Sequence, residues 1–218
     1  TERSHSCSQQ AQAKQSGLEV SMENCYNFSF FRAPIQNTVP DVAFSILDAY
    51  RYISEPIAKE RTEQLRTMAS QDEARLFKAR HFDYCTFSGL FESRSSSHLI
   101  QHSGLVCVDF DHVEDIPALK QQLLEHEYFD TILMFTSPSG NGVKWIVEVD
   151  LQGWEHSRFF KSMINCLKAT GLPPVDISGS DIARACFLPY DPNVYIHPKF
   201  QDDAKETFYT PAVGSMLR

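Results

Sequence analysis

The sequence predicts an α+β protein, and three observations lead to this class. Hydrophobic residues make up 42% of the 218 residues, with 16 Phe and 8 Tyr, which is enough for a packed core. Short segments with the alternation typical of strands are interspersed with longer segments of helical periodicity. From residue 104 onward these segments follow the order strand, helix, strand, strand, helix, strand.

Residues 25–97 are predicted to form an N-terminal α/β layer. A strand over 25–33 alternates aromatic and polar residues and ends before Pro34. Asp41 is expected to cap a helix whose apolar residues recur at helical spacing up to Pro56. Two further helices and a β-like segment complete the layer, over 57–68, 71–79 and 82–91.

Residues 98–200 are predicted to form a second unit, which begins after the Ser/Arg-rich segment 92–97. Its expected elements are strand 105–111, helix 115–127, strands 131–136 and 143–149, helix 154–169, and short strands 174–178 and 184–189. This βαββαβ order is that of an RRM-like, or ferredoxin-like, split unit. The polar flanks 1–24 and 201–218 predict a disordered lead and a tail linked to a possible downstream domain.

Charge and cysteine spacing exclude several classes of function. The net charge is −8, so no overall basic field attracts nucleic acid, although a local basic cleft still can. Positive charge does cluster locally, at Arg61, Arg66, Arg75, Lys78 and Arg80. The six cysteines lack paired spacing, so neither a zinc site nor a disulfide framework is expected. Because no apolar stretch reaches membrane-spanning length and no signal peptide is visible, we expect a cytoplasmic protein without a membrane partner.

The strand over 105–111 ends with two aspartates, Asp109 and Asp111. Side chains alternate along a strand, so both carboxylates project from one face, with Cα atoms roughly 6.5 Å apart. Val106, Val108 and Phe110 take the opposite face and are expected in the core. Unpaired carboxylates at the end of an apolar strand favour a divalent cation such as Mg²⁺ or Mn²⁺. The alternative is a plain strand exit, in which one Asp caps the next helix.

A glycine-containing turn precedes the strand over 143–149. Gly140 and Gly142 allow backbone N–H groups to approach an anion closely, and Ser139 and Asn141 add polar side chains. Lys144 begins the next strand and supplies a point charge suited to phosphate. The alternative is an ordinary hairpin with a surface lysine.

A third acidic position lies in the apolar segment Val-Asp-Ile at Asp176. Arg184 lies in another apolar run, where a guanidinium requires an anionic partner. Asp176 is therefore either a third metal ligand or the partner of Arg184 in a salt bridge, and Asp181 is a second candidate for that partner. Three carboxylates with a phosphate-binding turn suit nucleotidyl transfer assisted by two metal ions.

The combined motifs resemble those of the archaeo-eukaryotic primase superfamily. Within it the chain is similar to the VirE amino-terminal, primase-like domains of bacterial mobile-element and phage-type replication proteins. The matching stretches are TFSGLFESR (86–94), SGLVCVDFD (103–111), SPSGNGVK (137–144), VDI (175–177) and ARACFLPYDP (183–192). The resemblance covers about residues 25–200.

This resemblance implies a primase-polymerase core that acts in DNA replication on nucleoside triphosphates and a single-stranded DNA template, often followed by a helicase domain. It implies metal-ligand roles for Asp109, Asp111 and Asp176, with two Mg²⁺ or Mn²⁺ ions. Lys144 and Arg184 would neutralise phosphate. Many active members have His where Lys144 stands, and Lys keeps the charge but loses the planar donor geometry.

Two further residues and two further functions complete the sequence predictions. Lys78 and Arg94 are secondary candidates for template or phosphate contacts. The acidic net charge and Lys144 favour an alternative function, a catalytically inactive nucleic-acid-binding or protein-interaction module of a replication protein. A third hypothesis is a two-metal nuclease that uses the same carboxylates.

Overall fold

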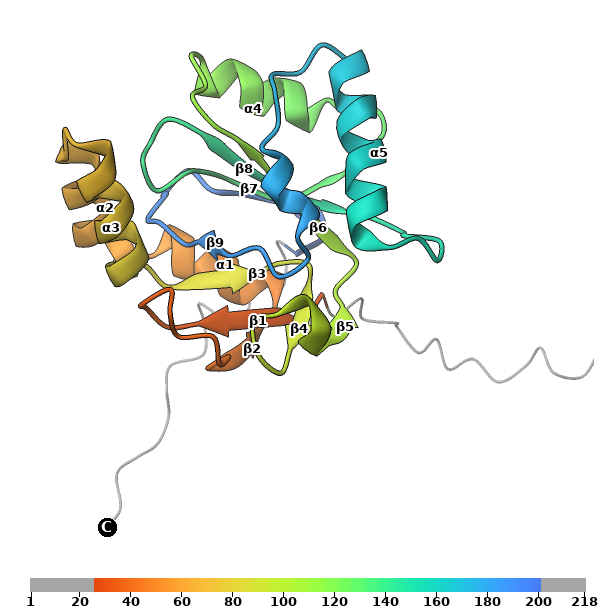
Figure 1. Cartoon of the computed structure of the whole chain (residues 1–218). Helices are drawn as coiled ribbons and strands as arrows, with labels where there is room; N and C mark the ends of the chain where they lie inside the picture. Colours follow the sequence, from red (N-terminus) through yellow and green to blue (C-terminus); the bar gives the residue numbers. More distant parts are fainter. Residues whose placement is uncertain (1–25, 201–218) are drawn as a thin grey trace, which may run out of the picture.

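The computed structural model describes residues 26–200, which form two four-stranded β-sheets and a two-stranded hairpin, with helices around them (Figure 1). The α+β class is confirmed. The flanks predicted as lead and tail, 1–24 and 201–218, lie outside the described residues. Among the described residues, no helix combines the length and the apolar character needed to cross a membrane.

The first sheet contains strands from both ends of the described chain. Its order is β2-β1-β3-β9, and every neighbouring pair is antiparallel. The strands are β1 (Phe28–Phe31), β2 (Val42–Phe44), β3 (Tyr84–Thr86) and β9 (Cys186–Phe187). A separate hairpin consists of β4 (Gly89–Phe91) and β5 (Leu99–His102), and it spans the boundary predicted over 92–97.

The second sheet carries the aspartate strand at one edge. Its order is β10-β7-β8-β6, again antiparallel throughout. The strands are β6 (Leu105–Phe110), β7 (Thr131–Thr136), β8 (Val143–Glu148) and β10 (Tyr195–Ile196). Helices α4 (Ile116–Leu124) and α5 (His156–Ala169) cover one face of this sheet (Figure 1). The predicted β-α-β-β-α order from β6 to α5 is therefore confirmed.

Alternation along β6 separates two cores. Val106, Val108 and Phe110 are fully buried against α4 and α5. Leu105 and Cys107 instead join the core that lies between the two sheets. Asp109 follows the same alternation as Leu105 and Cys107, so its carboxylate lies on the side of β6 that faces the first sheet.

Three helices belong to the N-terminal layer: α1 (Ile46–Ser54), α2 (Lys59–Thr67) and α3 (Gln71–His81). The predicted start of the first helix at Asp41 is wrong. Ser45 is the N-cap, in a capping box with Asp48, and Val42–Phe44 pairs with β1 as an edge strand. Asp41 instead forms an exposed ion pair with Arg32.

The last predicted strands are also partly wrong. Residues 177–180 form a short 3-10 helix, η3 (Ile177–Ser180), and only Cys186–Phe187 of the segment 184–189 is a strand. The cause is local, because the Asp176 carboxylate accepts a hydrogen bond from the Ser178 N–H at 2.9 Å and turns the chain. β10 was not predicted, because two residues are too few for a periodic pattern.

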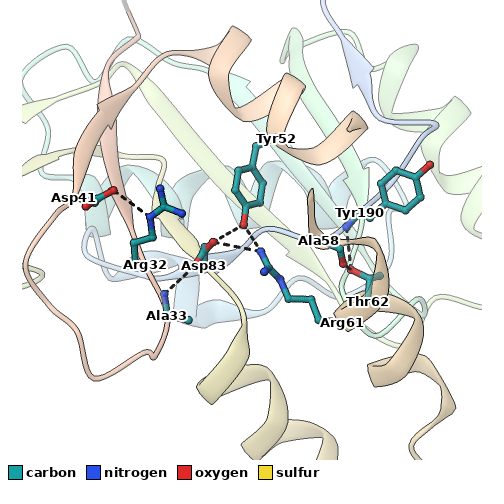
Figure 2. Close-up of polar contacts among 9 residues, drawn as sticks. All are labelled: Arg32, Ala33, Asp41, Tyr52, Ala58, Arg61, Thr62, Asp83 and Tyr190. Carbon is teal, nitrogen blue, oxygen red and sulfur yellow. Dashed lines mark hydrogen bonds and ion pairs between the residues drawn. The ribbon is translucent and has the colours of Figure 1, made fainter. Parts of the chain in front are cut away.

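A buried polar network joins α1, α2 and Asp83, the residue before β3 (Figure 2). Asp83 accepts hydrogen bonds from the Tyr52 hydroxyl at 2.5 Å and the Ala33 N–H at 2.8 Å, and its Oδ2 lies 3.3 Å from Arg61. Arg61 also donates to the Tyr52 hydroxyl oxygen. Burial raises the pKa of Tyr52, and the hydrogen bond to Asp83 raises it further, so Tyr52 stays a neutral donor. Through Arg61, the network ties α2 to Tyr52 on α1 and to Asp83.

Candidate metal centre

Three carboxylates converge at the end of β6. Asp109 is on the strand, Asp111 follows it, and Asp176 approaches from the segment before η3. The Asp176 N–H donates to the carbonyl oxygen of Asp109 at 2.9 Å, so this segment runs beside the edge strand. One oxygen from each carboxylate lies within 4.8 Å of the other two. Hard divalent cations prefer oxygen ligands at such spacing.

Asp109 has one satisfied and one unsatisfied oxygen. Its Oδ2 forms an ion pair with Lys144, which lies directly opposite on β8. Its Oδ1 is buried and has no hydrogen-bond partner. An unpaired carboxylate oxygen away from water is costly, so a cation at this position would remove that cost. The donor set therefore fits a divalent ion better than it fits the plain strand exit.

Asp176 is held ionised by its surroundings. Burial alone would raise its pKa, but hydrogen bonds from the Ser178 hydroxyl and N–H, with the charges of Arg184 and Lys144, lower the pKa overall. Arg184 donates to Asp176 Oδ2 at 3.3 Å, as the salt-bridge alternative predicted. Because Arg184 is half exposed, this pair leaves the carboxylate accessible to another cation.

The turn over 137–142 packs against the end of β6. The Ser137 N–H donates to the Gly142 carbonyl at 2.8 Å and closes the hairpin. A Cβ on Gly142 would lie 2.4 Å from the carbonyl oxygen of Phe110, so only glycine fits there. Gly140 has a φ of +81°, and a Cβ on it would lie 3.1 Å from Nε of Arg66. Ser139 and Asn141 are exposed, and their role in phosphate binding stays a prediction.

Several cations surround the carboxylates. Burial lowers the pKa of Lys78, the positive charges of Lys144 and Arg184 lower it further, and the charge of Asp111 acts in the opposite direction. Lys78 on α3 therefore belongs to the same charged cluster as the three aspartates. Its ammonium also lies 5.8 Å from the centre of the Phe187 ring.

Arg94 lies elsewhere in the structure. Its guanidinium packs over the Tyr84 ring at 5.2 Å and donates to the Ile35 carbonyl at 3.1 Å. Within residues 26–200, none of the contacts described for Arg94 involves the carboxylates. It therefore anchors the N-terminal layer and its proposed contact with a template stays a prediction.

Sequence reasoning missed the part that Arg66 plays. Arg66 on α2 donates to the carbonyl oxygens of Pro138 and Ser137, at 3.2 Å and 3.3 Å. These bonds tie the N-terminal layer to the turn over 137–142. The only sequence signal was the cluster of basic residues over 61–80, which did not distinguish Arg66 from its neighbours.

Comparison with known proteins gives one match. The family model described as BT4734-like, N-terminal domain matches residues 77–196, more than half of the 218-residue chain. The matched range contains the three aspartates, the turn over 137–142 and Lys144. A search of curated proteins found no match, and neither did a search of solved structures.

Proposed function

The chain belongs to the BT4734-like, N-terminal domain family, and we propose that it is a divalent-metal-dependent nucleotidyltransferase of the primase-polymerase type. The observation that carries the proposal is the cluster of Asp109, Asp111 and Asp176, with one oxygen of each within 4.8 Å of the others. The buried Oδ1 of Asp109 supports it, because this oxygen accepts no hydrogen bond and a cation there would offset the cost of its burial.

The sheet that carries the cluster supports the proposed resemblance to primases. β6, β8 and β7 are antiparallel neighbours with α4 and α5 on one face, as an RRM-like unit requires. The segment at Asp176 lies beside β6, where such a unit has its fourth strand, although it is not a strand here. The proposed catalytic face is the one toward the first sheet.

Each residue has a distinct role in the proposed reaction. Asp109, Asp111 and Asp176 would hold Mg²⁺ or Mn²⁺, and Asp176 would also orient the attacking 3′-hydroxyl. Bound there, two ions supply activation of that hydroxyl and charge stabilisation of the leaving oxygen. Lys144 and Arg184, with the backbone of the turn over 137–142, would neutralise the triphosphate. Lys78 is a further cation near the same charges.

A primer-extension assay with Mg²⁺ or Mn²⁺, nucleoside triphosphates and a single-stranded DNA template tests the proposal. Template-dependent growth of the product is the expected result. Shortening of the labelled template would instead identify the nuclease. Absence of both, together with salt-dependent binding of single-stranded DNA, would identify the inactive binding module.

One observation favours the inactive module. Lys144 already occupies an oxygen of Asp109, and both side chains are only 14% exposed. A cation provided by the protein itself thus competes with a metal ion for this ligand. Because Lys144 pairs with Asp109, a variant of Lys144 tests both the nucleotidyltransferase and the inactive module.

We expect the variant Lys144→Gln to bind Mn²⁺ more tightly, on the order of fivefold, because the competing ammonium is gone. The same variant should bind a nonhydrolysable triphosphate more weakly, on the order of tenfold, because a phosphate partner is lost. Calorimetry with each ligand measures both effects. Lys59→Gln removes the same charge from an exposed pair on α2 and should change neither affinity. If the affinities for Mn²⁺ and for the triphosphate both rose or both fell in Lys144→Gln, Lys144 would not have the two roles proposed for it.

A further inference from the structure

A cavity of about 730 Å³ lies next to η3, away from the contacts described above. Its walls come from three places: η2 (Ser96–His98) with β5, the start of α5, and the end of η3. Ser180 and Asp181 form the wall on the η3 side. These two residues belong to the segment between Asp176 and Arg184, so the cavity and the candidate metal centre share one stretch of chain.

An aromatic side chain stands in the wall. Trp154 lines the cavity and is 43% exposed, so part of its indole is open to a ligand. The guanidinium carbon of Arg158 lies 4.3 Å from the centre of the Trp154 ring. This stacking orients the indole and places a positive charge beside the cavity. The guanidinium covers one face of the indole, so a planar ligand can stack only on the opposite face.

The remaining polar groups of the cavity are acidic or neutral. Glu155 and Asp181 are its two formally charged lining residues, besides two histidines whose charge depends on pH. Carboxylates accept hydrogen bonds from amino groups and repel phosphate. The cavity therefore favours a ligand that carries amino donors and keeps any phosphate outside.

The two histidines, His102 and His156, form a directed chain of hydrogen bonds, and burial favours the neutral form of both. The Gly104 N–H donates to His102 Nδ1 at 3.0 Å, so the proton of His102 is on Nε2. That nitrogen lies 3.2 Å from His156 Nδ1, and His156 Nε2 lies 3.1 Å from the Gly179 carbonyl oxygen. Burial, with the neighbouring His156, lowers the pKa of His102 to about 4, and burial also lowers the pKa of His156.

The same chain of hydrogen bonds holds η3, the wall of the cavity that leads to the candidate metal centre. The Gly179 carbonyl is held by His156. A Cβ on Gly179 would lie 2.4 Å from Cζ of Phe160 and 3.1 Å from the carbonyl oxygen of Cys107, so η3 is tightly seated between α5 and β6. A ligand in the cavity would meet a rigid wall that continues directly to Asp176.

We propose that this cavity binds one unpaired base of a single-stranded nucleic acid, stacked on Trp154, with the adjoining phosphate near Arg158. Stacking on an aromatic side chain is tolerant of sequence, while the carboxylates of Glu155 and Asp181 favour bases that carry an exocyclic amino group. The inference rests on the proposed function, because a strand with a base here would pass η3 on its way to the carboxylates.

The test uses the intrinsic fluorescence of Trp154 in the whole chain, with a chelator present so that metal binding plays no part. The chain has two tryptophans, and the other, Trp145, is fully buried and donates to Thr131. A short single-stranded oligodeoxyadenylate should quench the exposed tryptophan. An abasic strand of equal length, which has the phosphates but no bases, should not quench it.

Variants give a second measurement, by fluorescence polarisation of a labelled oligodeoxyadenylate. Trp154→Ala should weaken binding about fivefold or more, whereas Trp154→Phe, which keeps a ring, should retain most of the affinity. The matched control is Tyr128→Ala, because Tyr128 is a 65% exposed aromatic residue outside the cavity. Wild-type affinity in Trp154→Ala, or equal quenching by the abasic strand, would overturn the proposal.

The same measurements separate this inference from the proposed function. Asp109→Asn should lose Mn²⁺ binding and keep the base-dependent quenching. If the chain binds no metal at all but shows that quenching, the proposed nucleotidyl transfer fails and the base site stands.

Discussion

Replacing Asp109 by Asn is expected to lower metal-dependent nucleotide incorporation about a hundredfold or more, because a proposed ligand of the metal ion is lost. Asn keeps the size of the side chain but cannot carry the negative charge that a divalent ion requires. Asp111→Asn should have a similar effect, since its carboxylate belongs to the same cluster. Single-turnover extension and calorimetry with Mn²⁺ measure the two losses.

The control for this prediction is Asp72→Asn, which removes the same charge from an exposed position in the first turn of α3. It should leave both activity and Mn²⁺ affinity unchanged. If Asp109→Asn and Asp111→Asn retain the activity of the unaltered protein, the assignment of the metal centre is wrong. If they lose Mn²⁺ binding in a protein that shows no incorporation, the cluster is a metal site without this chemistry.

The second large effect is expected on stability. Asp83→Ala should lower the free energy of unfolding by about 3 kcal/mol, because it leaves buried donors of Tyr52, Arg61 and Ala33 without their acceptor. Chemical denaturation followed by circular dichroism measures this change. Loss of the network should also loosen α2 and α3, which carry Arg66 and Lys78.

Asp41→Ala is the matched control, since it breaks another Arg–Asp pair of the same layer (Figure 2). Both partners of that pair are largely exposed, so the expected loss is at most about 1 kcal/mol. If Asp83→Ala and Asp41→Ala lowered the free energy of unfolding equally, the burial of Asp83 would not determine how much it contributes to stability.

The sequence predicted those parts of the fold that depend on local periodicity. The strand that bears Asp109, the two helices of the second unit and the hairpin after residue 136 all follow from spacing and turn residues. Asp109, Asp111 and Asp176 were also predicted as candidate ligands of one site, and one oxygen of each lies within 4.8 Å of the others. Asp176 joins the other two carboxylates as the N-cap of η3 and not as part of a strand, because its side chain accepts a hydrogen bond from Ser178.

Other features depend on contacts between distant residues and left no local signal. Asp41 and Ser45 are both acceptable helix caps, and only the pairing of Val42–Phe44 with β1 decides between them. Arg66 contacts the turn over 137–142 from 71 and 72 residues away in sequence. The contact between His102 and His156 likewise joins two segments that no spacing rule relates.

The return of the chain to the first sheet has a consequence for how the protein folds. β9 pairs with β3, and the Leu188 N–H donates to the Asp83 carbonyl at 3.0 Å, so residues near 187 complete a layer begun near 28. A fragment that ended before β9 would leave a strand edge open to other chains. Such distant pairings raise the entropic cost of the folding transition and slow folding. The three carboxylates come from residues 109–111 and from residue 176, so a fragment that contained only one of these segments would lack the cluster.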